Sequence, residues 1–448
     1  MNSIKKNWPA FLLPLSFSFG NLFKFLLFYL GLYYVENPIR WYGYIVSSVM
    51  FACFSGLVIL DMLKKRSFSN KAVVILSGVF SFYIFAFGIS FYKFGFTSTV
   101  LRYFEIFVVL CLPALFAGAY AGALRTEREF FSSMETLSIV VLPAAIIYFN
   151  GAIFNCSGFT DNRGLGVMNY MGVAYSFMPF LLVHIIQFTK DANWQVFNRA
   201  KKINPQIIRV IVIFIYWIDI IATGTRGCYI CVAFFCIALV VAKIFKPREI
   251  KKASMISVSL IFLLLFNMFV YAPQGMAGVD RMKIFVNGLK NGQLTTSVNE
   301  NEEIRKNIDE MVESDYHNDF SENGKEPLIR DRGTLYLVAL KEFKEAPIFG
   351  HGMGSYSLKY GLYPHNAVLE LLCETGIVGT LCVLLFIIYI LFKLVYTCKE
   401  NEEVVDLVLI FATYAVEANI SGTFWNCSVL LCAIGYGVTL LYPQKKYV

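Results

Sequence analysis

A histidine and an asparagine stand at the point where a long hydrophilic stretch gives way to an apolar one. His365 and Asn366 follow Pro364, and the apolar run that begins there is long enough to cross a membrane. Proline suits the first turn of a helix, where no N–H donor is needed, so we expect both residues on that turn, at the membrane–water interface. The positive end of the helix favours a neutral imidazole, which can accept a proton. The same pair could instead only hydrate the helix end.

Isolated arginines give a second chemical signal. Arg163 lies in a glycine-rich stretch, and Arg226 lies in a tight Thr-Arg-Gly hairpin. Arg332, with Arg330 as its substitute, comes four residues before Tyr336 in the long hydrophilic stretch. Lipid headgroup phosphate could satisfy one arginine at a membrane boundary. Several arginines held by tight turns favour a diphosphate, because each guanidinium binds two phosphate oxygens and keeps its charge.

A polyprenyl diphosphate suits this combination of residues. Its tail would stay in the lipid, and the arginines at the interface would stabilise the charge that grows on the leaving diphosphate. His365 would act as the general base that removes a proton from a sugar hydroxyl, and Asn366 would orient the sugar or the imidazole. We expect no metal ion and no cofactor, because the arginines supply the positive charge and this side shows no compact acidic motif.

The composition places these residues in a membrane protein. Of the 448 residues, 57% are apolar, 17% are aromatic and only 16% are charged, and the mean hydropathy is +0.60. These values lie outside the range of soluble domains. The net charge of +8 does not indicate a nucleic-acid partner, because the cations are distributed among the connections between apolar runs. We therefore expect an all-α polytopic membrane protein in a lipid bilayer.

Apolar runs predict about twelve transmembrane helices, with one large external loop between helices 9 and 10. Lysine and arginine are concentrated in alternate connections, which by the positive-inside rule makes those connections and both termini cytoplasmic. Three regions result: helices 1–9 over residues 1–272, a loop with short helices over 273–363, and helices 10–12 over 364–448. The predicted spans are 9–35, 41–63, 71–92, 98–123, 134–154, 166–189, 205–223, 227–245, 253–272, 366–396, 404–420 and 425–442.

Parts of the external loop should have structure of their own. Residues 334–344 carry apolar side chains at nearly helical spacing and are expected to form a helix that packs back on the membrane domain. Residues 300–316 could form a surface helix. A stretch with Pro347, Gly350 and Gly352 then makes a tight approach to the histidine, where backbone can come close to a ligand.

Several polar residues fall inside predicted spans. Glu370 and Glu374 are one helical turn apart on one face, and each could belong to a substrate path or to a structural pair. His184 is expected to be a core histidine with satisfied hydrogen bonds. Cys228 and Cys231 form a CxxC sequence inside a span and are expected to pack rather than bind a metal.

These motifs, in this order and all on the outer side of the membrane, resemble those of the O-antigen ligase and O-antigen polymerase superfamily of bacterial envelope glycan enzymes. The resemblance covers about residues 155–380, and two mild departures are Tyr336 and Thr225, where the family often has tryptophan and serine. It is carried by the Arg163 turn, the hairpin with Arg226, Arg332 before an aromatic residue, the approach from Pro347 to Gly352, and His365-Asn366 followed by Gly376 and Gly379.

The resemblance implies a metal-independent glycosyltransferase of the GT-C type in the bacterial inner membrane. Its active site would lie on the periplasmic face, which makes the large loop periplasmic, and its donor would be a glycan linked to undecaprenyl diphosphate. Residue by residue, Arg163, Arg226 and Arg332 would hold the diphosphate, and His365 would be the base.

Two reactions of the superfamily share this machinery. A polymerase transfers the growing chain onto the next lipid-linked repeat unit, whereas a ligase transfers the finished chain onto lipid A-core. The acidic loop suits phosphorylated core sugars poorly, which favours a polymerase with a glycan acceptor. A chain-length regulator is a candidate protein partner. The alternative of another class is a flippase for lipid-linked sugars, for which repeated halves and a cationic central cavity would be typical.

Overall fold

The computed structural model describes residues 68–154, 170–192, 204–266, 332–398, 401–425 and 427–444, with scattered residues between 22 and 60. Within these segments every regular element is helical, and six helices are long and apolar enough to cross a membrane. These six are Asn70–Phe94, Ser98–Leu124, Glu127–Asn150, Met171–Thr189, Pro205–Thr223 and Ala367–Thr397. The all-helical membrane class is therefore confirmed. The predicted helix at 300–316 lies outside the described residues, as does most of the first two predicted spans.

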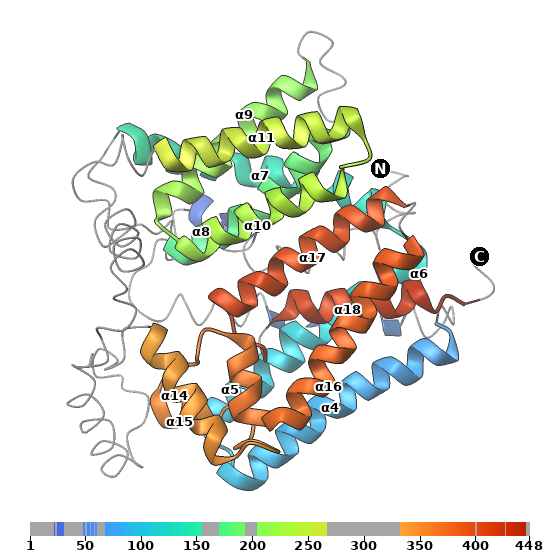
Figure 1. The fold of residues 1–448 in the computed structure, drawn as a ribbon, viewed down its shortest axis with the longest axis vertical. Helices are drawn as coiled ribbons and strands as arrows, with labels where there is room; N and C mark the ends of the chain where they lie inside the picture. Colours follow the sequence, from blue (N-terminus) through green and yellow to red (C-terminus); the bar gives the residue numbers. More distant parts are fainter. Residues whose placement is uncertain are drawn as a thin grey trace.

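The helices form two groups, and α17 of one group contacts α7, α8 and α10 of the other. In Figure 1, α7 to α11 lie together, and α4 to α6 lie with α16 to α18; α17 packs against α10 between the groups. The elements are α4 (Asn70–Phe94), α5 (Ser98–Ile106), the π-helical turn η2 (Phe107–Cys111), α6 (Leu112–Leu124), α7 (Glu127–Phe154), α8 (Tyr170–Thr189), α9 (Pro205–Thr223), α10 (Arg226–Ala242), α11 (Pro247–Phe266), α14 (Arg332–Glu345), α15 (Ser355–Tyr360), α16 (Ala367–Cys398), α17 (Glu402–Ile420) and α18 (Ser428–Leu441).

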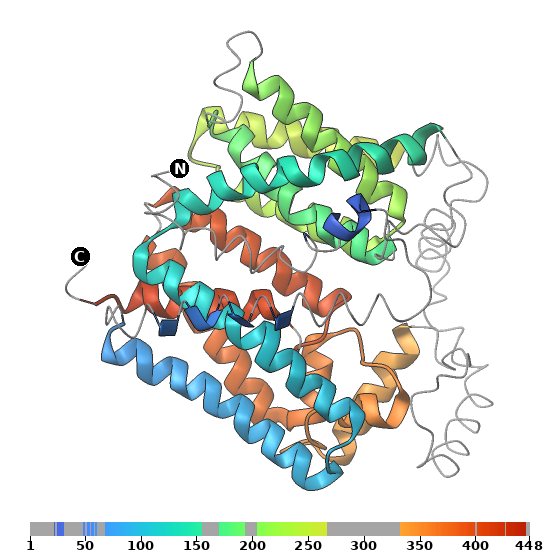
Figure 2. The ribbon, with the colours of Figure 1, turned by 180° about the vertical axis from the view of Figure 1, so that it is seen from behind.

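Small residues let α6 and α18 pack backbone to backbone, and Figure 2 shows the pair from the side hidden in Figure 1. A Cβ atom on Gly118 would overlap the carbonyl group of Cys432, and one on Gly435 would overlap that of Leu115. Thr439 Oγ1 also donates to the carbonyl of Ala119 at 2.7 Å. Close approach through glycine and threonine is typical of helix packing in membranes. This pair forms the core of the second group.

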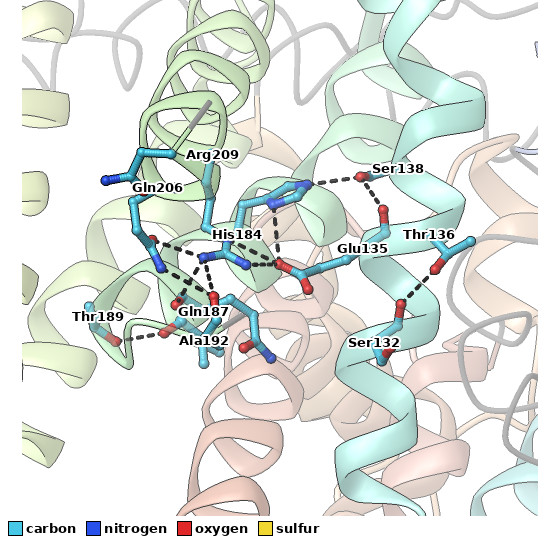
Figure 3. A network of polar contacts seen from close by, with 12 residues as sticks. Ser132, Glu135, Thr136, Ser138, His184, Gln187, Thr189, Ala192, Gln206 and Arg209 are labelled. Carbon is cyan, nitrogen blue, oxygen red and sulfur yellow. Dashed lines mark hydrogen bonds and ion pairs between the residues drawn. The ribbon is translucent and has the colours of Figure 1, made fainter. Parts of the chain in front are cut away.

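A buried ion pair fastens α7, α8 and α9 near the end of the bundle at which α9 begins (Figure 3). Glu135 Oε1 accepts hydrogen bonds from Arg209 Nε at 3.0 Å and Nη2 at 2.6 Å. Arg209 Nη1 also donates to the carbonyl of Ala192, just beyond α8, at 2.9 Å. His184 Nε2 lies 2.9 Å from Ser138 Oγ. The prediction that His184 is a core histidine is confirmed by its complete burial, and its Nδ1 lies 3.8 Å from Glu135 Oε1.

Basic residues of the predicted cytoplasmic connections meet acidic residues at this same end of the bundle. The fully buried Asp406 near the start of α17 pairs with Lys190 at 2.5 Å and with Lys243 at 3.0 Å. Lys246 pairs with Glu402. These ion pairs join the ends of α8 and α10 to the start of α17. We call this the ion-pair end, and the end at which α10 begins and α15 lies the α15 end.

The helix α16 is broken at Gly376, which has φ 65° and ψ −170°. The segment 347–352 crosses the break, with hydrogen bonds from Ile377 N–H to the carbonyl of Pro347 and from Gly352 N–H to the carbonyl of Glu374, both 2.9 Å long. We call this segment the strap. A Cβ atom on Gly350 would overlap the backbone at Glu374, whereas one on Gly352 would lie 3.3 Å from the ring of Phe94 on α4. The expectation that these glycines come close to a ligand stays a prediction.

The helix predicted over 334–344 is confirmed as α14. Its apolar side chains pack on α16 through a small core of Leu335, Val338, Ala339, Tyr356 and Cys373. The strap, α14 and α15 thus form one structured unit against the first half of α16.

Candidate functional site

The helix α16 begins three residues after Pro364, and Asn366 is its N-cap. The Oδ1 atom of Asn366 accepts hydrogen bonds from the backbone N–H groups of Val368 at 3.1 Å and Leu369 at 3.0 Å. His365 precedes the cap with φ 55°, a left-handed conformation that is uncommon for a non-glycine residue. The expectation that His365 and Asn366 lie on the first helical turn is therefore wrong, because a side-chain cap and not the proline sets the helix start.

The imidazole of His365 is held from two sides. Its Nδ1 atom lies 3.4 Å from the carbonyl oxygen of Ser421, and the ring of Tyr363 lies against it with centroids 4.2 Å apart. The hydroxyl of Tyr363 donates to the same carbonyl at 3.3 Å. Because a carbonyl oxygen can only accept, this contact requires the proton on Nδ1 and makes Nε2 the basic nitrogen.

The carbonyl of Ser421 belongs to residues 419–425, the end of α17 and the connection that follows it, which we call the polar turn. Asn366 Nδ2 donates to the carbonyl of Asn419 at 3.1 Å, and Asn419 Oδ1 lies 3.3 Å from the N–H of Val368. The residues before and after His365 are therefore bonded to the polar turn. Sequence analysis did not single out this turn, although its clustered small polar residues between two apolar runs were a visible signal.

Arg226 is the first residue of α10 and is exposed. The preceding hairpin turns through Gly224, which has φ 71°, and the N–H of Thr225 donates to Thr223 Oγ1 at 3.2 Å. The positive end of a helix dipole and a guanidinium therefore lie at one place, an arrangement that favours an anion.

The polar turn brings Arg226 and His365 to the same end of the molecule. Gly227 packs so closely on this turn that a Cβ atom there would overlap Ser421 Oγ and would lie 2.5 Å from the hydroxyl of Tyr175. His365 contacts the carbonyl of the same serine. Ser421 therefore contacts His365 of one group of helices and Gly227, the residue after Arg226, of the other.

The remaining candidates lie on or near α14. Arg332 is its first residue, and Tyr336, one turn later, is half-buried and packs on the small core beneath the helix. Arg163 and Arg330 lie outside the described residues, so their predicted roles stay predictions.

The unit that carries Arg332 is fixed to the membrane helices. Ser90 Oγ of α4 donates to the carbonyl of Met353 at 2.8 Å, and the hydroxyls of Tyr103 on α5 and Ser357 on α15 lie 2.8 Å apart. These bonds hold α15 and the end of the strap against α4 and α5. Arg332, the first residue of α14, therefore belongs to a unit that is bonded to α4 and α5.

Glu370 is buried and bonded to the polar turn. Thr423 Oγ1 lies 2.7 Å from its Oε1 and 2.8 Å from its Oε2, and the N–H of Phe424 donates to Oε2 at 2.6 Å. No part of its surface is exposed. Of the two alternatives for this glutamate, a substrate path or a structural pair, the contacts favour the structural one.

Glu374 joins three elements one turn further along α16. Its Oε2 accepts from the N–H of Gly354 at 2.8 Å and from Trp425 Nε1 at 2.6 Å, and its Oε1 accepts from the N–H of Tyr356 at 3.3 Å. It therefore ties the start of α15 to the polar turn. The contacts of Glu374 therefore also favour a structural pairing over a place in a substrate path.

One cluster on α14 has donor spacing that would suit a metal ion. Donor atoms of Glu342, Glu345 and His351 lie within 4.8 Å of one another. Lys359 Nζ donates to Glu342 Oε1 at 2.8 Å, and the hydroxyl of Tyr360 donates to it at 2.6 Å. Burial acts to raise the pKa of Glu342, but these two hydrogen bonds and the charge of Lys359 outweigh it and hold that pKa below its usual value. The lysine ammonium thus already balances the buried carboxylate.

The family comparison covers most of these elements. Residues 211–384 match the family model described as O-antigen ligase, and no curated protein and no solved structure matches the chain. The matched region contains Arg226, Arg332 and His365 but ends before the polar turn. This match supports the assignment to the O-antigen ligase/polymerase superfamily that the motifs of the chain resemble.

Proposed function

We propose that the protein is an integral membrane glycosyltransferase of the O-antigen polymerase type. In this reaction a sugar hydroxyl of the next lipid-linked repeat unit attacks the anomeric carbon of the glycan carried by undecaprenyl diphosphate. The bond from that carbon to the diphosphate breaks, and the proton of the hydroxyl passes to His365 Nε2. Metal ions are not required, because arginines neutralise the charge on the leaving diphosphate.

The observation that carries the proposal is the contact between His365 Nδ1 and the carbonyl of Ser421 at 3.4 Å. It requires the tautomer that a general base needs, with Nε2 able to accept a proton. The packing of Gly227 on the same serine supports a site shared with Arg226. A base and a diphosphate-binding arginine beside the same turn suit the transfer of a glycan from a lipid diphosphate.

We assign the remaining candidates by chemistry. Arg226 and Arg332 bind the diphosphate and stabilise its charge in the transition state. Arg163 and Arg330 are further diphosphate ligands. Tyr336 contacts the sugars, and Asn366 orients the imidazole through its bonds to the helix start and the polar turn.

The proposal includes the membrane topology. Twelve transmembrane helices, divided as 1–272 and 364–448 by the loop at 273–363, would place the α15 end in the periplasm and both termini in the cytoplasm. The position of basic residues at the ion-pair end supports this orientation in the inner membrane. The lipid-linked donor would then reach the site from the bilayer, and a chain-length regulator would be a partner in that membrane.

A ligase that transfers the finished polysaccharide to lipid A-core is the second candidate. It is favoured by the description of the matching family model, O-antigen ligase. The two reactions use the same donor and leaving group and differ in the acceptor.

Deletion of the gene in its native host separates the two reactions on a gel of surface lipopolysaccharide. A band of core plus one repeat, without a ladder, indicates a polymerase, and bare core with polymer on the lipid carrier indicates a ligase. Complementation with His365→Ala should give the same profile as the deletion at equal protein level. A full ladder from His365→Ala would overturn the proposal.

A further inference from the structure

We propose that Glu370 is a positioning residue that fixes the polar turn so that the carbonyl of Ser421 holds the His365 imidazole. The inference rests on the proposed function, in which His365 is the general base. It assigns a role to a buried carboxylate that does not touch the substrate.

Short hydrogen bonds join Glu370 to the polar turn. Thr423 Oγ1 lies 2.7 and 2.8 Å from the two carboxylate oxygens, and the N–H of Phe424 lies 2.6 Å from Oε2. These distances lie at or below the usual lengths of O–H···O and N–H···O hydrogen bonds. All three partners are buried, Glu370 completely and Thr423 with 8% exposure. Water therefore competes little for these bonds.

Ser421 lies between two fixed points. On one side, Asn419 is bonded to Asn366 at 3.1 Å. On the other side, Thr423 is bonded to Glu370. Both anchors come from the start of α16, next to His365, so the imidazole and its carbonyl acceptor are placed by the same helix end.

The position of Ser421 has a chemical consequence for His365. The carbonyl of Ser421 selects the tautomer with the proton on Nδ1 and sets the direction in which Nε2 points. The contact is already 3.4 Å long, so a shift of the turn would break it. Misplacement of a catalytic group by about 1 Å can cost about 100-fold in rate. Loss of the Glu370 anchor should therefore lower the rate of the chemical step.

The experiment compares Thr423→Val with Thr423→Ser in the full-length protein, purified in lipid nanodiscs with a lipid-diphosphate glycan donor. Valine removes the hydroxyl at similar volume, whereas serine retains it. We expect Thr423→Val to lower kcat by about tenfold or more and to change the acidic limb of the pH profile. The KM for the donor should change less than kcat, because Arg226 and Arg332 are held by α10 and α14, whereas His365 is held by the turn itself. Thr423→Ser should retain most of the kcat.

The matched control is Thr413→Val on α17, the helix that leads into the polar turn. Thr413 is fully buried, and its hydroxyl donates to the carbonyl of Leu409 at 2.8 Å, two turns from the polar turn. This variant should lose similar stability but keep its kcat. Equal losses of kcat per folded protein in Thr413→Val and Thr423→Val would show a general structural effect and overturn the inference.

A second variant, Glu370→Gln, guards against poor folding of Thr423→Val. Its amide oxygen can accept from Phe424 N–H and its NH₂ can donate to the Thr423 hydroxyl, so it should fold and keep most of its activity. A folded but inactive Glu370→Gln would show that the charge is used and would overturn a purely geometric role. If Thr423→Val has wild-type kcat while His365→Ala is inactive, the inference is wrong and the proposed function stands. An active His365→Ala would overturn the proposed function itself.

Discussion

Gly350 and Gly376 lie where two backbone segments cross, and neither position has room for a side chain. A Cβ atom on Gly350 would overlap the backbone at Glu374, and one on Gly376 would overlap the backbone at Ile348. The crossing holds the strap against the break in α16. The unit with α14 and α15 is therefore attached to the same helix that begins at the Asn366 cap.

Gly376→Ala should destabilise the protein more than its backbone conformation alone explains. Gly95, the C-cap of α4, has nearly the same conformation, φ 67° and ψ −162°, but no atom within 4 Å of an added Cβ. Gly95→Ala should therefore cost about 1–3 kcal/mol of strain, and Gly376→Ala should add the overlap with the strap. Thermal unfolding in detergent measures both. Equal shifts of the two midpoints would contradict the close crossing.

Asn366→Ala should remove both the cap of α16 and the bond to the polar turn. Loss of an asparagine N-cap costs about 1 kcal/mol. The control is Asn401→Ala, because Asn401 caps α17 at the ion-pair end with a bond of 3.3 Å from the N–H of Val404. Both variants should lose stability, Asn366→Ala the more because it also loses the bond to Asn419, but only Asn366→Ala should lose transferase activity per folded protein. A similar loss of activity in both would contradict a role for Asn366 at the site.

Hydropathy predicted where the helices lie but not where α16 breaks. The apolar run that contains Gly376 continues on both sides, so its pattern fits one long helix. The break depends on the strap, whose N–H and C=O groups bond to the helix backbone across it. Such a contact between distant segments leaves no periodic signal in either one.

Only part of the candidate site was predicted, because the rest depends on contacts between segments that are distant in the sequence. The types of His365, Arg226 and Arg332 carry their chemistry in the sequence, and the matching family region includes all three. The predicted start of α16 was wrong because Asn366, a strong N-cap residue, sets the start at Ala367 although Pro364 also suits a first turn. The polar turn was not predicted because it acts through backbone atoms, such as the Ser421 carbonyl that contacts His365, and backbone contacts do not depend on residue type.

Lys359→Met should change the pH dependence of stability through Glu342. The pKa of Glu342 is lowered in the folded protein, so its contribution is present above the unfolded pKa of about 4.3 and is lost as the pH falls through the lower, folded value. Without the lysine, less opposes the effect of burial, so the pKa of Glu342 should be higher than in the wild type. The variant should therefore be less stable than wild type near neutral pH, and the difference should narrow as the pH falls.

The control is Lys344→Met, an exposed lysine on the same helix. Thermal midpoints at several pH values test the prediction. A difference between Lys359→Met and wild type that stays constant with pH would show that the ion pair does not set the titration of Glu342.

Arg226→Lys should weaken donor binding although it keeps the positive charge. A lysine ammonium is a point charge and cannot form the two parallel bonds that a guanidinium makes to phosphate oxygens. Loss of one charged hydrogen bond costs about 1.5–3 kcal/mol, which corresponds to roughly a 10- to 100-fold higher KM for the lipid-diphosphate donor if the loss is in binding. If the arginine acts mainly on the leaving charge, kcat should fall instead.

The control is Arg248→Lys, because Arg248 pairs with Asp191 at 2.8 Å at the ion-pair end and is 82% exposed. Steady-state transfer at varied donor concentration should give wild-type values for this variant. Unchanged kcat and KM in Arg226→Lys would argue against bidentate diphosphate binding at the start of α10. Restored transfer with Arg226→Lys at high donor concentration would place the loss in binding, and a persistent loss would place it in the transition state.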